Sequence, residues 1–214
     1  MPDTAATPHC PGDPRELVLA SSSPRRRQLL HDLGLSFTVD SGDVDETVEP
    51  GASIASVVST LALAKARDVA QRHPSALVIG ADTLVALGTR ILGKPRDASD
   101  AREMLRALSD NRHRVYTGLV ALDAATQTFE SRLVETDVYF RELTDSEIDA
   151  YLRTDEPFDK AGSYGAQGLG STFVRRIDGD YFNVVGLPLA ELNDLLRGFG
   201  ACLICRRLQS DRGD

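Results

Sequence analysis

The chain has few cysteines, and their number is odd. Its 214 residues include three, Cys10, Cys202 and Cys205, so a disulfide framework like that of small secreted proteins is not expected. Cys202 and Cys205 form a Cys-x-x-Cys pair, and His9 with Cys10 could in principle complete a four-ligand zinc site. No second Cys-x-x-Cys supports such a site, so we expect these thiols to be incidental.

The sequence also lacks long apolar runs and a recognisable targeting segment. No apolar stretch approaches the roughly 20 residues that a membrane span requires. Residues 1–16 have neither a basic start nor an apolar centre, so we expect no signal peptide. We expect a cytoplasmic protein that does not bind membranes, with residues 1–16 forming a flexible N-terminal tail.

Positively charged residues are fewer than negatively charged ones. The chain has 24 Lys and Arg against 32 Asp and Glu, which gives a net charge of −8 and a pI of about 5.0. This balance argues against broad nucleic-acid binding through a basic surface, so any cationic site must be local. A hydrophobic content of 42% with 26% charged residues is typical of a globular protein long enough to bury a core.

The stretch around which the chain is organised begins with an apolar run at residues 17–20, followed by three serines, Pro24 and a basic segment. It predicts a strand, a tight turn and a helix with Ser22 or Ser23 as N-cap. Arg25–Arg27 occupy the first turn, where the helix dipole favours acids rather than cations. A phosphate would compensate, because hydroxyls, free N–H groups and guanidinium groups converge there. The alternative is a solvated basic helix face.

A second helix is predicted from Ser53 to Arg72, before Pro74. Lys65 falls inside its apolar stripe, so this lysine must extend to solvent, pair with an acid or point into a polar cleft.

A continuous apolar run at 76–81 predicts a buried strand, which we expect to place Asp82 and Thr83 at its C-terminal end, where α/β proteins commonly hold ligands. A hairpin is predicted next. Residues 88–94 match the first seven positions of a P-loop, but Pro95 at the eighth lacks both the hydroxyl and the N–H that the motif needs. We therefore reject the P-loop and retain Lys94 as a candidate phosphate contact.

Further elements follow from periodicity and capping. They are helices at 98–108 and 144–153, paired strands at 112–122 and 129–140, a strand at 171–177, a hairpin turn at 178–180, and a helix beginning at 188 and ending at 198. Residues 157–170 form a glycine-punctuated loop that carries Lys160 and Gln167. A strand rather than a helix is expected after this loop, so it is not a dinucleotide fingerprint. A polar, frayed tail is expected at 200–214.

Taken together, the candidate side chains match a site for metal-bound polyphosphate. The cations are Arg25, Arg26, Lys65, Lys94 and Lys160, and the acids are Glu46 and Asp82. Carboxylate oxygens suit Mg²⁺ or Mn²⁺, and fixed cations match the remaining phosphate charge. No serine, histidine or cysteine lies in an obvious nucleophile motif, which favours metal-assisted attack by water.

Six ordered motifs resemble those of the Maf nucleotide pyrophosphatases. They are Ser21-Ser-Ser-Pro-Arg-Arg-Arg27 with the following leucines, Val44-Asp-Glu46, Leu63-Ala-Lys65-Ala66, Gly80-Ala-Asp-Thr83, Gly93-Lys-Pro95 and Asp159-Lys-Ala-Gly-x-Tyr-Gly-x-Gln-Gly168. The match covers roughly 17–199. It implies an α/β fold with an elongated, twisted mixed sheet flanked by helices and two lobes around a central cleft, commonly as a homodimer. It also implies hydrolysis of a nucleoside triphosphate to the monophosphate and pyrophosphate.

Motif variants within the family indicate which nucleotide base the substrate carries. Ser-Pro-Arg-Arg, Ala-Asp-Thr and Ala-Gln-Gly are similar to the branch acting on dTTP and UTP, whereas the 7-methyl-GTP branch tends to show Trp, Ser-Asp-Gln and Ser-Glu-Gly. The differing positions here are Arg25, Thr83 and Gln167. The resemblance therefore assigns substrate selection to these three residues.

Our hypothesis for the chemistry makes Asp82 the general base, with Glu46 and Asp82 contacting a divalent metal. The triphosphate contacts would be Ser22, Arg25, Arg26, Lys65, Lys94 and Lys160, although Lys160 could instead pair with Asp159 or Asp82. Two alternatives stay open: a non-catalytic nucleotide sensor that regulates septum formation and cell division, and hydrolysis of modified nucleotides.

Overall fold

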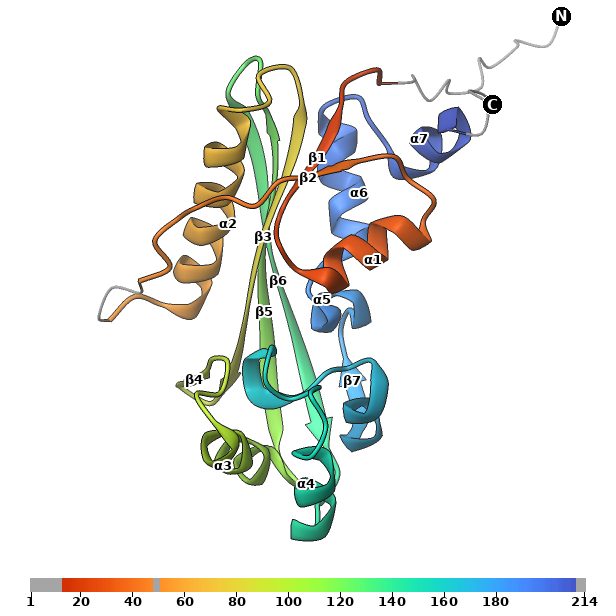
Figure 1. The fold of residues 1–214 in the computed structure, drawn as a ribbon. Coiled ribbons are helices and arrows are strands. Elements are labelled where there is room, and N and C mark those ends of the chain that lie inside the picture. Colours follow the sequence, from red (N-terminus) through yellow and green to blue (C-terminus); the bar gives the residue numbers. More distant parts are fainter. Residues whose placement is uncertain (1–12, 48–50, 211–214) are drawn as a thin grey trace, which may run out of the picture.

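The computed structural model describes residues 13–47 and 51–210 and has the expected α/β architecture (Figure 1). Its strands form one mixed seven-stranded sheet in the order β2-β1-β3-β5-β6-β7, with β4 paired to β3. The strands are β1 (Leu17–Ala20), β2 (Thr38–Val39), β3 (Leu77–Leu87), β4 (Arg90–Leu92), β5 (Arg112–Asp123), β6 (Thr128–Phe140) and β7 (Val174–Asp178). β1 runs parallel to β2 and β3, and the other pairs are antiparallel.

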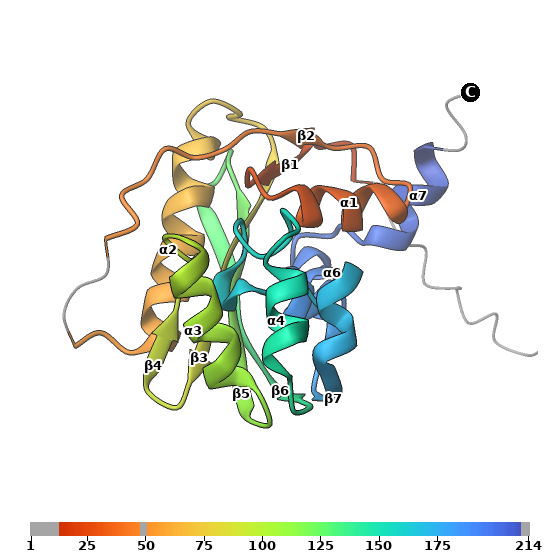
Figure 2. The same ribbon diagram turned by 60° about the horizontal axis from the view of Figure 1, so that its bottom comes forward.

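Helices cover both faces of this sheet. They are α1 (Pro24–Asp32), α2 (Ile54–Ala70), α3 (Ala98–Leu108), α4 (Asp145–Tyr151), α5 (Tyr181–Val185), α6 (Leu189–Gly198) and α7 (Leu203–Ser210), with 3₁₀ turns η1 (Ala161–Ser163) and η2 (Gly168–Phe173). In Figure 1, α2 lies on one side of the upper sheet and α1, α6 and α7 on the other, while α3 and α4 lie at the lower end. Figure 2 brings this lower end forward. The long strands β3, β5 and β6 run through both ends and join the two lobes.

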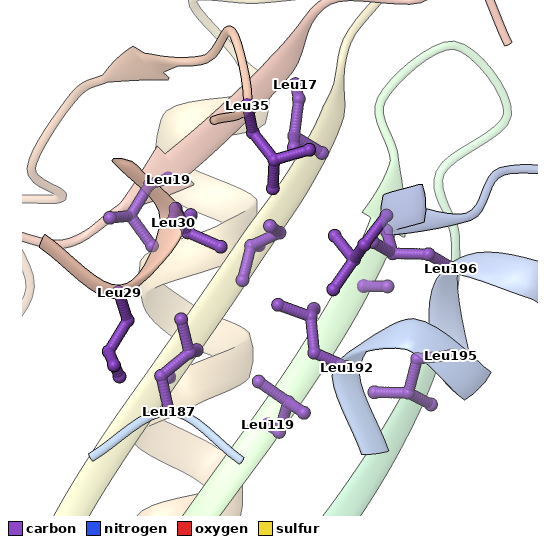
Figure 3. Packing of buried hydrophobic residues seen from close by; sticks show 14 of the residues in the cluster. Leu17, Leu19, Leu29, Leu30, Leu35, Leu119, Leu187, Leu192, Leu195 and Leu196 are labelled. Atoms are coloured by element: carbon purple, nitrogen blue, oxygen red, sulfur yellow. The ribbon is translucent and has the colours of Figure 1, made fainter. Parts of the chain in front are cut away.

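The upper lobe has a hydrophobic layer on each face of the sheet. On one face, leucines of β1, α1 and α6 pack against β3 and β5 (Figure 3). On the other face, α2 packs small residues onto the same strands. A separate cluster fills the lower lobe, where α3, α4 and η2 pack on the far ends of β3, β5 and β6.

The side of α2 that faces the sheet approaches the strands very closely. A Cβ atom on Gly80 of β3 would lie 2.3 Å from the carbonyl oxygen of Ala62, and one on Gly118 of β5 would lie 2.3 Å from the carbonyl oxygen of Val58. Only glycine tolerates this spacing. The two glycines therefore set the distance between α2 and the sheet.

Most predicted elements are confirmed, including α3, the β5–β6 pair and α4, whose capping box is formed by Thr144 and Glu147. One strand assignment is wrong. β3 does not end before Asp82 but continues unbroken to Leu87, and Asp82 pairs with Gly118 in the middle of the ladder. Polar side chains fit inside this strand because its long antiparallel pairing with β5 continues after its pairing with β1 has stopped.

Three corrections concern the C-terminal third. Residues 168–173 form a 3₁₀ turn, and the strand begins only at Val174. The expected hairpin turn at 178–180 instead starts helix α5, because the carboxylate of Asp180 accepts a hydrogen bond from the N–H of Phe182. The tail expected to be frayed contains helix α7, because Leu203 packs into the core and Arg206 pairs with Asp13.

No helix within 13–47 and 51–210 is long and apolar enough to cross a membrane. Cys202 is buried and Cys205 lies in α7, with their sulfur atoms 2.6 Å apart. The other residues of the considered zinc site, His9 and Cys10, lie outside the described residues.

Candidate active site

A cavity of about 650 Å³ lies between the two lobes. Elements from both ends of the chain line it, including the turn before α1, α2, the middle of β3 and the glycine-rich loop at 157–170. All the site residues predicted from the sequence line this cavity: Ser22, Arg25, Arg26, Glu46, Lys65, Asp82, Thr83, Lys94, Lys160 and Gln167. The structure therefore brings together side chains that are as much as 145 positions apart in the sequence.

Asp82 lies at the floor of the cavity because of where β1 ends. The last parallel partners of β1 and β3 are Ala20 and Gly80. Because side chains alternate along a strand, Asp82 is the first residue beyond the end of β1 whose side chain lies on the same face of β3 as Gly80. The chain after β1 turns here into α1, where the Ser23 hydroxyl accepts a hydrogen bond from the N–H of Arg26. Asp82 is only 8% exposed, so its carboxylate faces the cavity rather than bulk water.

Lys65 pairs with acids, which resolves the three possibilities left open by its position in an apolar stripe. Its Nζ lies 2.6 Å from Oδ1 of Asp82 and 2.6 Å from Oε1 of Glu46. The Lys65 and Asp82 side chains are largely buried, whereas that of Glu46 is 64% exposed. Glu46 reaches the site from a loop tied to α2 through the N–H of Asp43, which donates to Asp68 Oδ2 at 3.2 Å.

Arg26 is buried, and the protein itself uses all three of its side-chain nitrogens. Nε donates to the carbonyl of Gly186 at 2.7 Å, Nη1 to Ser21 Oγ at 3.0 Å and the carbonyl of Ala81 at 2.9 Å, and Nη2 to Thr83 Oγ1 at 2.9 Å. Burial lowers the pKa of Arg26 to about 10. The guanidinium group therefore ties α1 and β3 to the end of α5. Binding a phosphate directly would require it to give up some of these contacts.

Thr83, a predicted specificity residue, belongs to the same network. Its Oγ1 accepts from Arg26 and lies 2.9 Å from Oγ1 of Thr117. Thr117 is fully buried and directly opposite Thr83 in the β3–β5 register. Sequence reasoning missed Thr117, because threonine is common in strands and only the register places it beside the site.

Above these buried groups, Asp159 links two cations. Arg25 Nη1 lies 3.1 Å from Asp159 Oδ2, and Lys160 Nζ lies 2.5 Å from Asp159 Oδ1. Burial alone would raise the pKa of Asp159, but Lys160 and Arg25 hold it below its ordinary value. The prediction that Lys160 could pair with Asp159 is confirmed. Lys94 is exposed and makes no hydrogen bond or ion pair with any residue that the structure describes.

A residue missed from the sequence, Glu156, holds the C-terminal end of the glycine-rich loop, just after the exposed Gln167. Its carboxylate accepts hydrogen bonds from the N–H groups of Leu169 and Gly170, each at 3.0 Å, and from the hydroxyl of Tyr151 at 3.0 Å. No sequence motif marks this acid. Its position just before a run of glycines, whose N–H groups need acceptors, is the only available signal.

A buried aromatic contact supports the middle of this loop. His113 of β5 lies with Nε2 2.7 Å from the hydroxyl of Tyr164, and both rings pack edge-on against Phe140. Burial lowers the pKa of His113 to about 4 and raises that of Tyr164. The pair is therefore neutral at neutral pH and fixes Tyr164, which lines the cavity.

Glu46 and Asp82 offer two carboxylates to a divalent ion that would also bind a phosphate ligand. Oxygens of Glu46 and Asp82 converge on one position, since both lie 2.6 Å from the same nitrogen. Mg²⁺ usually takes one or two carboxylates and completes its shell with phosphate oxygens and water. Across the described ranges, no group of three or more His, Cys, Asp or Glu side chains could hold a metal unaided. The donor set therefore fits a metal that is shared with a phosphate ligand.

These features define an α/β protein with a cleft that is lined by cations and two convergent carboxylates and is suited to a polyphosphate ligand. The family model described as Maf-like protein matches residues 16–199. The chain belongs to this family, as its motifs indicated.

Named relatives match most of the chain. A protein of Bacillus cytotoxicus named dTTP/UTP pyrophosphatase is 50% identical over 186 residues, which cover 86% of this chain and 96% of the relative. A protein of Pelotomaculum thermopropionicum with the same name is 49% identical, covering 87% and 97%. Among solved structures, a HAM1 protein from Coxiella burnetii is 15% identical with a TM-score of 0.43, covering 92% of this chain and 95% of that one.

Proposed function

We propose that this protein is a nucleoside triphosphate pyrophosphatase that hydrolyses dTTP and UTP to the nucleoside monophosphate and pyrophosphate. The observation that carries the proposal is about 50% identity, across nearly the whole length, to relatives named for this activity. The cleft supports it, because the cations and carboxylates that such a reaction needs line one cavity.

Asp82 acts as the general base in this proposal. Its Oδ1 faces the position shared with Glu46, where Lys65 lies in this structure, and would contact the metal there. Oδ2 is left to take a proton from water. The water oxygen forms a bond to the α-phosphorus, the bond between that phosphorus and the bridging oxygen breaks, and pyrophosphate leaves. Before nucleotide binds, Lys65 fixes the orientation of the base, and the near burial of Asp82 limits its contact with bulk water.

Glu46 and Asp82 would hold a divalent cation, Mg²⁺ or Mn²⁺, together with phosphate oxygens. When bound, the metal neutralises charge on the triphosphate and favours attack at phosphorus. The remaining phosphate charge is matched by Arg25, Lys94 and Lys160, with Ser22 at the N-terminus of α1. Arg26 shapes the floor through its contacts with Ser21 and Thr83.

Base selection is assigned to Arg25, Thr83 and Gln167. The exposed amide of Gln167 can both donate to and accept from a pyrimidine edge. Thr83 acts through its position, since Arg26 and Thr117 already occupy its hydroxyl. We further propose that the protein is cytoplasmic and homodimeric, that residues 17–199 form the catalytic domain, and that nucleic acids and membranes are not its partners.

The test is release of pyrophosphate and monophosphate across a panel of canonical and modified nucleotides with Mg²⁺ or Mn²⁺, comparing the wild type with Asp82→Ala. We expect selective turnover of dTTP and UTP, and a loss of about 10²- to 10⁴-fold in the variant, because a general base typically contributes that much. Nucleotide binding without hydrolysis would overturn the proposal and favour a nucleotide sensor instead. Preferential turnover of a modified base would keep the chemistry and change the substrate.

A further inference from the structure

The ammonium group of Lys65 occupies the point on which the two metal-binding candidates converge. It lies 2.6 Å from one oxygen of Glu46 and 2.6 Å from one oxygen of Asp82. Two carboxylates facing one another across a narrow gap repel unless a cation lies between them. In this structure Lys65 provides that cation.

A divalent ion and the Lys65 ammonium cannot share this position. A metal bound to both carboxylates would sit about 2 Å from each oxygen, within a few ångströms of a positive nitrogen whose side chain, like that of Asp82, is largely buried. The repulsion at such a distance is large where water is scarce. The ammonium group must therefore move away before the two carboxylates can hold a metal.

The triphosphate gives the ammonium group another place to go. Lys65 lines the same cavity as the phosphate-binding candidates, and its stem is flexible. When phosphate oxygens arrive, they can accept the hydrogen bonds now made to Glu46 and Asp82. The carboxylates are then released to the metal.

We propose that Lys65 is a positioning residue that holds the place of the divalent ion, keeping Glu46 and Asp82 together and blocking metal until nucleotide binds. The inference rests on the proposed function, because it concerns the same metal and nucleotide. Metal and nucleotide then bind with positive coupling, and the coupling acts equally in both directions. Because Lys65 leaves the carboxylates only when nucleotide binds, the metal does not occupy the cleft alone.

The test measures Mn²⁺ affinity directly, by the electron paramagnetic resonance signal of free Mn²⁺, with and without α,β-methylene-dTTP. In Lys65→Met, we expect Mn²⁺ without nucleotide to bind about tenfold or more tightly than in the wild type, because a competing charge is gone. The coupling between Mn²⁺ and the analogue should fall in parallel. Lys65→Arg keeps the charge and should show no such gain.

Two controls locate the effect. Lys94→Met removes the same charge from the cavity but not from the carboxylates, and should change Mn²⁺ affinity by less than about threefold. Adding Asp82→Asn to Lys65→Met should abolish the gain. Lys65→Gln repeats the test with a polar side chain should the methionine variant fold poorly.

Unchanged or weaker Mn²⁺ binding in folded Lys65→Met or Lys65→Gln would overturn the inference, since a purely structural or phosphate-binding lysine predicts that result. Wild-type pyrophosphate release distinguishes this failure from failure of the proposed function. An active wild type with no Mn²⁺ gain in the variants rejects the inference alone. An inactive wild type whose variants do gain Mn²⁺ affinity rejects only the function.

Discussion

The cleft has two regions of opposite character. The floor is formed by Arg26, Lys65, Asp82 and Thr83. It is largely buried, and each of these side chains makes a hydrogen bond or ion pair with another residue of the chain. The rim, formed by Arg25, Lys94 and Asp159, is exposed to a greater degree, with side chains 29% and 57% exposed for Arg25 and Asp159.

The basic run in the sequence suggests a single task, binding an anion, but the structure gives its residues two different tasks. Arg25 and Arg26 are neighbours in the sequence, yet one faces solvent at the rim and the other is sealed beneath it. Charges on the floor are held by short contacts in a poorly hydrated environment, so they determine geometry. Charges on the rim are screened and loosely held, so they suit the capture of an anion from solution.

The strongest way to test the comparison is to remove each of the two arginines. Arg26→Met should lower the free energy of unfolding by about 3 kcal/mol, because it strands buried acceptors on Ser21, Ala81 and Gly186. The matched variant Arg25→Met should cost less than about 1 kcal/mol, as expected for an exposed ion pair. Urea unfolding of both variants measures the difference, and equal losses would refute the division into floor and rim.

The buried histidine beneath the glycine-rich loop should make stability depend on pH. His113 has a pKa of about 4 in the fold against about 6.5 when unfolded, so the unfolded chain binds more protons between these values. Stability is therefore lost as pH falls, by about 1.5 kcal/mol from His113 between pH 6.5 and pH 5.

This contribution can be isolated with two aromatic variants. His113→Phe should flatten the pH dependence of the unfolding free energy by that amount, whereas Tyr164→Phe keeps the buried imidazole and should retain the slope. A slope that survives in His113→Phe would place the titrating group elsewhere.

The smallest effect is expected at the rim. Asp159→Asn should change stability by less than about 1 kcal/mol, because its pairs with Arg25 and Lys160 involve a half-exposed carboxylate. The same change removes an acid that competes with phosphate for these cations. We expect KM for dTTP to fall about two- to threefold at low salt and the difference to fade at high salt. A KM that rises at every salt concentration would show that Asp159 itself aids binding.

Much of this arrangement was predictable, because strong local patterns coincide with the tertiary structure. The amphipathic helices and the β5–β6 pair followed from periodicity. The set of residues that line the cleft followed from the ordered motifs. Asp82 was placed at a strand end because the apolar run stops there, whereas β3 continues for five more residues to Leu87, paired with β5 as far as Ala86.

Other features depend on contacts that a sequence does not display. A charged residue in the sequence gives no sign of burial, so Arg26 was indistinguishable from Arg25. Thr117 and Glu156 depend on strand register and on loop amides 13 or more positions away. Helix α7 was missed because its segment is polar, and its anchoring contacts, Leu203 in the core and Arg206 on Asp13, involve distant parts of the chain.

The two glycines beneath α2 have a consequence that reaches the chemistry of the cleft. Lys65 touches Asp82 only because Gly80 and Gly118 let the helix backbone rest against the strands. A single methyl group at Gly118 would leave every charge of the cleft in the sequence, yet it would lift the helix and draw the ammonium group away from its two carboxylates. The alignment of Lys65 with Asp82 is thus set partly by two glycines that carry no functional group, where a search for catalytic residues would not look.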